Sequence, residues 1–173
     1  MLNIIDIFPI LKEHFRTLKE DTSLFGAIFI FVILPLLLSI ALLLFDITLS
    51  KEILNTLITS FAIFVGFTIN VLVILLKNRE EKIRIRNKLI EHLTYNSLYE
   101  LVLGLIILFL AIITLALIPK IIVSLLIILS LILYFLVFNF IFTMLMISKR
   151  FFVIFYCKLT KTKGDKQQGK QHH

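Results

Sequence analysis

The sequence predicts an all-α integral membrane protein, a bundle of four transmembrane helices with both chain termini in the cytoplasm. The first observation is composition: 60% of the 173 residues are hydrophobic, whereas a soluble domain has about 45–50%. The second is that the apolar residues form unbroken runs long enough to cross the roughly 30 Å hydrocarbon core of a bilayer. The third is the position of the Lys and Arg residues, which lie almost entirely on one side of these runs.

The N-terminal segment is too charged to cross a membrane. Pro9 suits the first turn of a helix, where its missing N–H is no loss. Leu11, Phe15 and Leu18 then follow at helical spacing on one face, and charged residues occupy the rest. This pattern predicts an N-terminal amphipathic helix that lies among the lipid headgroups, or that packs instead against the protein's own cytoplasmic parts.

Four segments are expected to span the membrane, and they are bounded by short turns or by charged stretches. They cover residues 24–45, 53–76, 98–118 and 121–147. Pro35 lies in the middle of the first span and removes one backbone hydrogen bond, so it is expected to kink that helix.

The second span is the most polar of the four. Thr56, Thr59, Ser60 and Gly66 are small residues of the kind that let membrane helices approach one another closely. We therefore expect this helix to lie in the interior of the bundle.

A charged stretch, residues 77–97, separates the second span from the third. Its apolar residues cluster on one side of a helical wheel, which predicts a cytoplasmic helix, either a continuation of the second span or a separate element. This helix is expected to pack on the protein's own tail or on another subunit. The apolar residues 151–156 extend beyond the fourth span and are expected to lie in the interface or to dock on that helix. Residues 1–157 thus form one membrane domain, and residues 158–173 are expected to be a disordered basic tail.

The basic residues predict the topology. The N-terminal segment carries three of them, residues 77–97 six and the region after the fourth span seven, whereas the two opposite turns carry only Lys51 and Lys120. Lys and Arg beside membrane spans are retained in the cytoplasm. The chain is therefore expected to be a multi-pass membrane protein with its N- and C-termini in the cytoplasm.

No catalytic or metal-binding pattern is visible in the sequence. Cys157 is the single cysteine, and the only paired histidines, His172 and His173, stand at the end of the polar tail. No nucleophile–base set is apparent, and no apolar run carries an ionisable residue in its middle, as ion-coupled transporters usually do. We therefore expect neither an enzyme nor a cofactor.

Two asparagines are the most specific polar feature of the spans. Counted from the cytoplasmic ends of their helices, Asn70 and Asn139 lie at similar depths of about 10 and 15 Å. An amide in hydrocarbon needs a hydrogen-bonding partner. The two are expected either to pair and join the second and fourth spans, or to line a pore in an oligomer.

Charged residues at the cytoplasmic side suggest two further contacts. Glu100, in the first turn of the third span, could form an ion pair with Lys149 or Arg150. The basic surface is expected to attract anionic inner-leaflet lipid or a cytosolic protein partner, and direct nucleic-acid binding is weakly supported because aromatic residues are not interleaved with the basic ones. This surface comprises Lys77, Arg79, Lys82, Arg84, Arg86, Lys88, Lys149 and Arg150.

Three segments resemble small four-span membrane proteins encoded in bacterial phage-defence loci, whose general plan is that of the membrane subunit of the two-gene Kiwa system. The segments are TSFAIFVGFTINVLVILL, NSLYELVLGLII and FNFIFTMLMISKRFFVIFY, and the polar points of the resemblance are Asn70, Asn96, Tyr99, Lys149 and Arg150. The resemblance covers most of the chain outside the tail. It implies a role at the inner membrane during infection, as a sensor or a pore-type effector that acts with a cytosolic partner.

Other functions are compatible with the same pattern. Short length, short outer turns and a basic tail also fit a holin-like or toxin-like protein that permeabilises the membrane by itself. An accessory subunit of a transporter is a further alternative. The defence-associated protein is expected to be a homo-oligomer, and small-residue packing is compatible with several numbers of subunits.

Overall fold

The computed structural model describes residues 8–21, 23–77, 84–120 and 122–168, and all regular structure within these ranges is helical. In chain order the elements are α1 (Phe8–Asp21), α2 (Leu24–Ile28), the π-helical segment η1 (Phe29–Ile33), α3 (Leu34–Leu44), α4 (Lys51–Lys77), α5 (Arg84–Leu117), the 3₁₀ turn η3 (Ile118–Lys120) and α6 (Val123–Gln168).

Four helices are long and apolar enough to cross a membrane, which confirms the predicted spans. They are Phe25–Leu44, Lys51–Lys77, Ile90–Leu117 and Val123–Phe152. The first of these combines α2, η1 and α3. The chain is therefore a multi-pass membrane protein.

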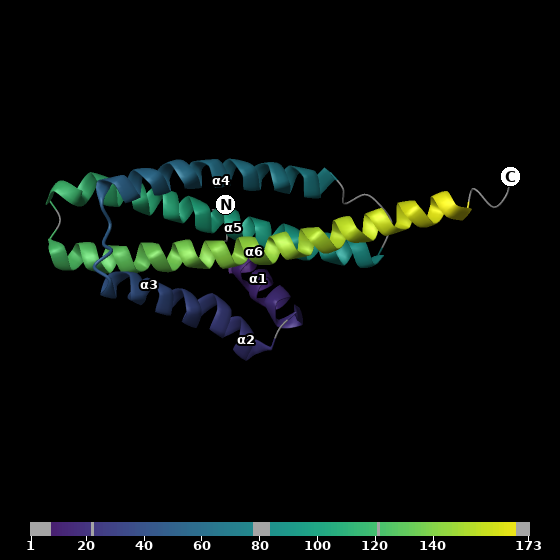
Figure 1. Ribbon diagram of the computed structural model, residues 1–173, viewed down its shortest axis with the longest axis horizontal. Coiled ribbons are helices and arrows are strands. Elements are labelled where there is room, and N and C mark those ends of the chain that lie inside the picture. Colours follow the sequence, from purple (N-terminus) through teal and green to yellow (C-terminus); the bar gives the residue numbers. More distant parts are fainter. Residues whose placement is uncertain (1–7, 22, 78–83, 121, 169–173) are drawn as a thin grey trace, which may run out of the picture.

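The spans pack in the order α4, α5, α6, α3, so that α4 and α3 lie at opposite edges (Figure 1). Short turns join α3 to α4 and α5 to α6 at one end of the helices, and α1 packs near the other end, which we call the α1 end. The prediction that the second span lies in the interior of the bundle is wrong. α4 packs mainly along α5 and reaches α6 through side chains such as Phe61, so one side of this helix remains uncovered.

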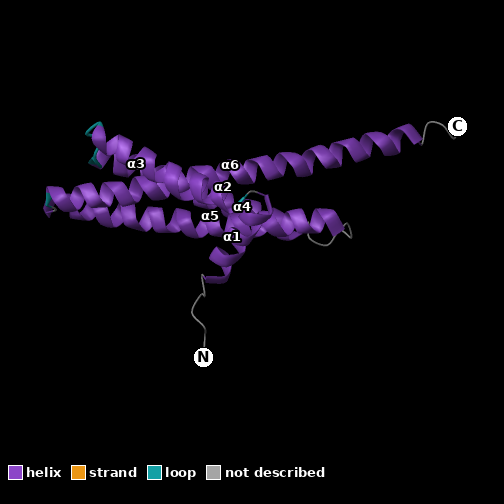
Figure 2. Ribbon diagram, turned by 90° about the horizontal axis from the view of Figure 1, so that it is seen from below, coloured by secondary structure: helices purple, strands orange, loops and turns teal. Residues whose placement is uncertain are grey.

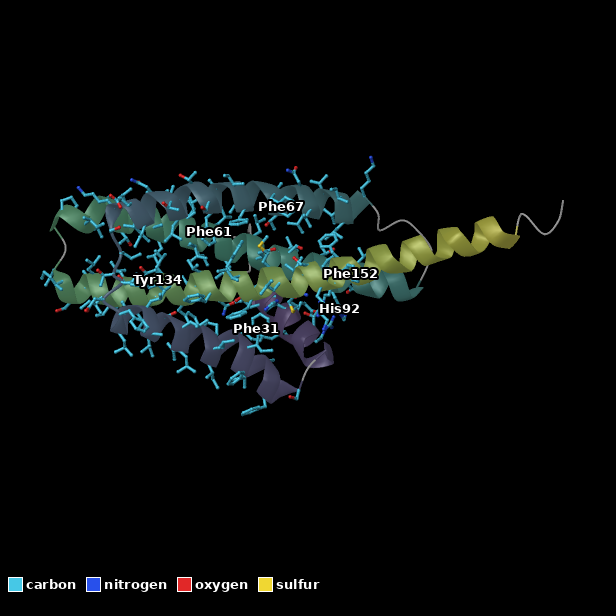
Figure 3. The ribbon with its side chains drawn as sticks, in the orientation of Figure 1. Phe31, Phe61, Phe67, His92, Tyr134 and Phe152 are labelled. Carbon is cyan, nitrogen blue, oxygen red and sulfur yellow. The ribbon has the colours of Figure 1, made fainter. Side chains whose placement is uncertain are left out.

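The core between the spans is built around aromatic residues. Phe140 of α6 lies 4.8 Å from Phe61 and 5.7 Å from Phe64, measured between ring centroids, and so links α6 to α4. Figure 3 shows Phe61 and Tyr134 among the side chains of this region. Gly104 of α5 leaves the space that Phe140 fills, since a Cβ there would come within 3.3 Å of the Phe140 ring.

The first span is interrupted near Pro35, as its position predicts. The helix widens into η1 just before the proline, and the N–H of Leu34 donates to the carbonyl of Phe29, five residues back. Pro35 occupies the first turn of α3, where its missing N–H is tolerated. A π-helical segment and a proline in succession are a recognised cause of helix bending.

α3 ends in a Schellman motif. The N–H of Ile47 donates to the carbonyl of Leu42, and the N–H of Asp46 to that of Leu43. Asp46 itself has φ 57°, a left-handed conformation in which Gly is usual and Asp is tolerated. The turn is also held by α6, because Ser130 Oγ accepts a hydrogen bond from the N–H of Leu49 at 3.2 Å.

The described part of the charged stretch, from Arg84 onward, is continuous with the third span. α4 ends at Lys77, residues 78–83 lie outside the described part, and α5 runs without a break from Arg84 into the membrane-spanning region. Ile90 and Leu93 of α5 pack with Leu75 of α4 and Ile147 of α6, and Phe151 joins this cluster. These residues thus pack against the second and fourth spans of the same chain, whereas the prediction named the protein's own tail or another subunit.

The structure also differs from the expected disordered tail. α6 extends as one helix of 46 residues to Gln168, well past the other helices (Figure 2). At 1.5 Å per residue it is about 69 Å long, more than twice the thickness of a hydrocarbon core. No proline interrupts residues 158–168, so the backbone hydrogen bonds continue; residues 169–173, with the terminal histidines, lie outside the described part.

α1 packs on α5 and α2 with an unexpected face. His14 and Thr17 are fully buried, whereas Phe15, part of the predicted apolar face, is 46% exposed. The uncharged polar residues His14 and Thr17 therefore face the protein, whereas the charged residues Lys12 and Arg16 are exposed. An apolar residue remains on the outside, as in a protein surrounded by lipid.

Candidate functional site

Polar side chains from three helices meet where α1 packs against the spans. They are buried or half-buried although most of their neighbours are apolar, and together they form what we call the α1-end cluster. Its members are His14 and Thr17 of α1, Asn96 and Tyr99 of α5, and Asn139 and Arg150 of α6.

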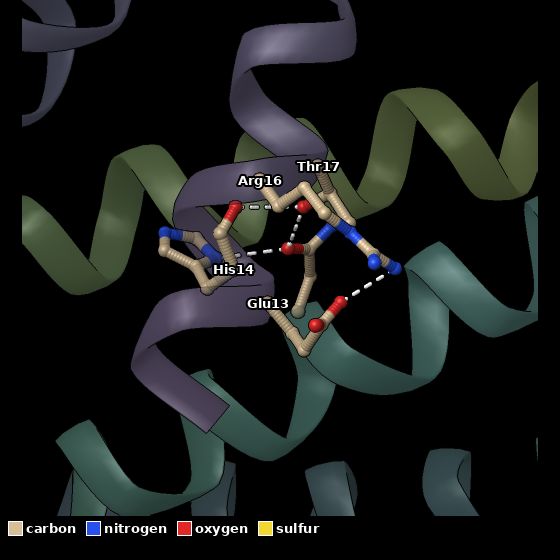
Figure 4. Close-up of polar contacts among 5 residues, drawn as sticks. Glu13, His14, Arg16 and Thr17 are labelled. Carbon is tan, nitrogen blue, oxygen red and sulfur yellow. Dashed lines mark hydrogen bonds and ion pairs between the residues drawn. The ribbon is translucent and has the colours of Figure 1, made fainter. Parts of the chain in front are cut away.

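Asn96 is the centre of the contacts that α1 makes, through His14 and Thr17, which Figure 4 labels. Its side-chain oxygen lies 2.8 Å from His14 Nδ1 and 3.0 Å from the Thr17 hydroxyl. Since that oxygen only accepts, His14 donates from Nδ1 and carries its proton there. The Thr17 hydroxyl is also 2.7 Å from the carbonyl of His14, one turn back in the same helix.

The contacts continue from His14 into the spans. The imidazole stacks on the ring of Tyr99, with 3.9 Å between centroids and 14° between planes. The Tyr99 hydroxyl donates to the side-chain oxygen of Asn139 at 3.1 Å, and the Asn139 amide donates to the backbone carbonyl of Phe31 at 2.7 Å. α1, α5, α6 and η1 are thus connected through one chain of contacts.

Pro35 explains why Asn139 finds a partner in the first span. In a regular helix the carbonyl of Phe31 would accept the N–H of residue 35, and a proline has none. Asn139 supplies the missing donor from another helix. The ring of Phe31, labelled in Figure 3, also lies perpendicular to the imidazole of His14 with 5.8 Å between centroids, so Phe31 contacts the cluster with both backbone and side chain.

Burial keeps His14 neutral. Removal from water lowers the pKa of its imidazole from 6.5 to about 4; the hydrogen bond with Asn96 opposes the change, and the positive charge of Arg150 adds to it. A histidine that stays uncharged at neutral pH can stack on Tyr99 and donate to an amide oxygen without the cost of a buried charge.

Arg150 was expected to belong to an exposed basic surface, but it is buried in the cluster. Only 6% of the residue is exposed, and its Nη2 donates to the carbonyl of Thr17 at 3.3 Å. Arg150 follows Lys149 in the same helix, so successive side chains point about 100° apart. Lys149 is accordingly exposed while Arg150 holds α1.

The expected ion pair of Glu100 with Lys149 or Arg150 is not among the contacts made by the residues that the structure describes. Glu100 is buried in α5. The ion pair found in this region joins Glu13 and Arg16 within α1, at 2.6 Å.

The structure also separates Asn70 from Asn139. Asn139 is bonded to Tyr99 and Phe31, as described, whereas Asn70 lies on the uncovered side of α4 and is exposed. The two residues lie at similar depths along their helices, but depth does not determine which side of a helix a residue occupies. The expected pair is not formed within the chain.

The other residues of the predicted basic surface lie within residues 78–83, which are outside the described part, or on either side of them. Lys77 is exposed at the end of α4. Arg84, Arg86 and Lys88 lie in the first turns of α5, and Arg79 and Lys82 lie outside the described residues. The structure does not bring Lys77 and Arg150 into one surface, since Arg150 points inward.

The sequence reading missed His14 and Thr17. The prediction for this helix, on lipid headgroups or against the protein's own cytoplasmic parts, was based on Leu11, Phe15 and Leu18 and gave the polar residues no partners. The available signal was the pair His14 and Thr17, uncharged and three residues apart, on a helix whose other polar residues are charged.

This arrangement can transmit structural change but shows no site for a metal: no group of three or more His, Cys, Asp or Glu residues in the described ranges could hold one. Asn96 adds an unsatisfied group, since its side-chain nitrogen is buried without a hydrogen-bond partner among the described residues. Comparison with protein-family models, curated proteins and solved structures finds nothing that matches the chain.

Proposed function

We propose that this protein is a sensor in a bacterial inner membrane that acts with a cytosolic partner in defence against phage, through α1. The observation that carries the proposal is the chain of contacts from α1 to the interrupted first span. His14 and Thr17 hold Asn96, His14 stacks on Tyr99, and Asn139 connects Tyr99 to the carbonyl that Pro35 leaves free.

The interrupted span is the element that the membrane would act on. A helix with a π-helical segment and a proline has fewer regular backbone hydrogen bonds to resist bending than an unbroken one. A change of bilayer tension or thickness would alter its bend, and the bond between Asn139 and Phe31 would transmit that change to Tyr99 and His14.

In the proposed orientation of the chain in the membrane, α1 and the end of α6 lie in the cytoplasm, where a partner could reach them. It is supported by the sixteen basic residues on that side against two on the other. The antiphage role is supported by the resemblance given above, in which Asn96, Tyr99 and Arg150 are polar points; these three residues all belong to the α1-end cluster.

The test is a phage challenge in a bacterial host that expresses the protein together with the product of its neighbouring gene. Membrane potential is followed with a potential-sensitive dye before and after infection. We expect no change of potential on expression alone, protection on infection, and loss of the response in Asn96→Leu, which removes the acceptor that holds α1.

A matched control is Ser148→Ala, because Ser148 is exposed on α6 and its hydroxyl bonds only to the carbonyl of Met144 in its own helix. It should respond like the wild type. Loss of potential on expression without phage would contradict the sensor and favour a holin-like or toxin-like protein. Absence of protection in any combination would contradict the antiphage role.

A further inference from the structure

A narrow strip of amides, a hydroxyl and small residues interrupts the exposed side of α4, which otherwise carries large apolar residues such as Ile63, Phe67 and Val73. Five residues follow one another at steps of four, three, four and four, which places them along one side of the helix, away from the packed residues Leu54, Phe61 and Thr68. All five are exposed, and we call them the α4 face. They are Asn55, Thr59, Ala62, Gly66 and Asn70.

Other exposed surfaces of the spans are different. Leu36 and Leu37 of α3 and Ile112 and Ile113 of α5 are exposed large hydrophobic residues, as lipid requires. The α4 face is thus distinguished from its surroundings by amides, a hydroxyl and small residues.

Asn70 is the most costly residue on the α4 face. It lies seven residues before Lys77, about 10 Å from the end of the helix, and therefore within the hydrocarbon region. Its side chain makes no hydrogen bond to any residue in the described part of the chain, whereas the amide of Asn139 is bonded on both sides. Lipid tails cannot replace the missing partners.

No close contact within the described part of one copy of the chain requires a glycine at position 66. A Cβ on Gly104 would meet Val65 at 3.1 Å and Phe140 at 3.3 Å, so close packing accounts for that glycine. A Cβ on Gly66 would meet nothing within 4 Å. Glycine in a helix interior costs about 1 kcal/mol relative to alanine, and its usual benefit in membranes is the close approach of a second helix.

We propose that the α4 face binds the α4 face of a second copy of this chain, with the two copies related by a two-fold axis normal to the membrane. A second copy inserts in the same orientation, and a two-fold axis places like residues opposite each other. The Asn70 side chain carries both a donor and an acceptor, so two identical amides satisfy one another. Gly66, one turn from Ala62, lies at the closest approach of the two helices.

This interface is independent of the proposed role in phage defence. It requires only that α4 crosses a membrane. A monomeric protein that acts as a sensor would contradict the dimer alone, and a dimer without a defence role would contradict the proposed function alone.

The first experiment is disulfide cross-linking in native membranes, in the Cys157→Ser background that removes the single cysteine. Thr59→Cys and Gly66→Cys place a thiol on the α4 face, and Ile113→Cys places one on an exposed part of α5. We expect oxidation to give disulfide-linked dimers for the first two and none above background for the third. Equal cross-linking at all three positions, or dimers at residue 113 alone, would overturn the proposal.

The second experiment measures dimer formation directly, by energy transfer between labelled copies in vesicles. Asn70→Leu should weaken the dimer about threefold to tenfold through the lost interhelical hydrogen bonds, and Gly66→Leu should weaken it further by preventing close approach. Ile113→Leu is the matched control and should leave the dimer unchanged.

Both substituted side chains enter open space on the exposed side of α4, so the single chain should fold normally, and helix content measured by circular dichroism checks this. A monomeric wild-type protein in vesicles would overturn the proposal. So would a dimer that is insensitive to both substitutions, or capture of α4 by a different membrane protein in place of a second copy.

Discussion

His14 shows how much one side chain changes the role of its helix. On a surface helix it would be an ordinary imidazole with a pKa of 6.5, but burial against Tyr99 and Asn96 keeps it neutral down to a pH of about 4. The state in which α1 is docked therefore binds fewer protons between these two pH values than the state in which α1 is released.

The docking of α1 should depend on pH in a defined direction. It is fully stable above pH 6.5 and is progressively weakened as the pH falls from 6.5 towards 4, by roughly 3 kcal/mol in total. Hydrogen exchange of the α1 amides, corrected for the intrinsic pH dependence of exchange, should show faster opening at pH 4.5 than at pH 7. His14→Gln, which keeps a donor for Asn96, should lose most of this dependence; an unchanged pH profile in that variant would assign the effect to other groups.

At Asp46 the backbone conformation is expected to matter more for stability than the carboxylate side chain. At φ 57° a residue with a branched Cβ is strained, whereas glycine is not. Asp46→Val should lower the free energy of unfolding in detergent by about 1–2 kcal/mol, and Asp46→Gly should leave it unchanged or slightly raised. Equal loss in both variants would show that the carboxylate, and not the backbone, is what the turn requires.

At the scale of elements, the first span and α6 depend on each other. The π-helical segment and Pro35 leave the Phe31 carbonyl without its usual donor, and Asn139 provides one from α6. A local defect in one helix is thereby satisfied by the neighbouring helix. This makes their packing more specific than apolar contacts alone would be.

A double-mutant cycle tests this dependence. Asn139→Leu should cost about 1–3 kcal/mol of unfolding free energy, because the Phe31 carbonyl and the Tyr99 hydroxyl both lose a partner. With Pro35→Ala also present, residue 35 supplies an N–H, and the cost of Asn139→Leu should fall by about half. Unfolding in mixed detergent micelles measures both values; strict additivity of the two substitutions would contradict the account.

At the scale of the whole molecule, the four spans form an open row with α4 and α3 at the edges, and the long α6 extends from one end (Figures 1 and 2). An open row has two edges that lipid or protein must cover. The α3 edge is apolar, and the α4 edge carries the α4 face.

Topology can be tested with the native cysteine. Cys157 follows the fourth span and is predicted to be cytoplasmic, whereas Lys51 is exposed at the opposite end of the helices. A membrane-impermeant maleimide applied to intact cells should label Lys51→Cys in the Cys157→Ser background and should not label Cys157 in the wild type. Lysed cells should be labelled at both positions. Labelling of Cys157 in intact cells would reverse the predicted orientation.

Much of the architecture could be predicted from the chain alone. The four spans match the apolar runs, Pro35 interrupts the first of them, and Ile90 and Leu93 pack as the wheel of their segment indicated. The cluster could not be predicted in the same way. His14 and Asn96 are 82 residues apart and Asn139 and Phe31 are 108 apart, and nothing in their local sequence relates them.

The sequence by itself determined the number of membrane crossings, because a span requires only enough consecutive apolar residues to satisfy its own backbone in hydrocarbon. The tertiary structure alone decided which side of each span meets another helix. A helix that is apolar all round carries little periodic signal to orient it, so Asn139 turned inward and Asn70 outward through long-range packing. The same packing turned His14 and Thr17 of α1 towards the protein, since Asn96 of α5 and Arg150 of α6 supply their partners in other helices.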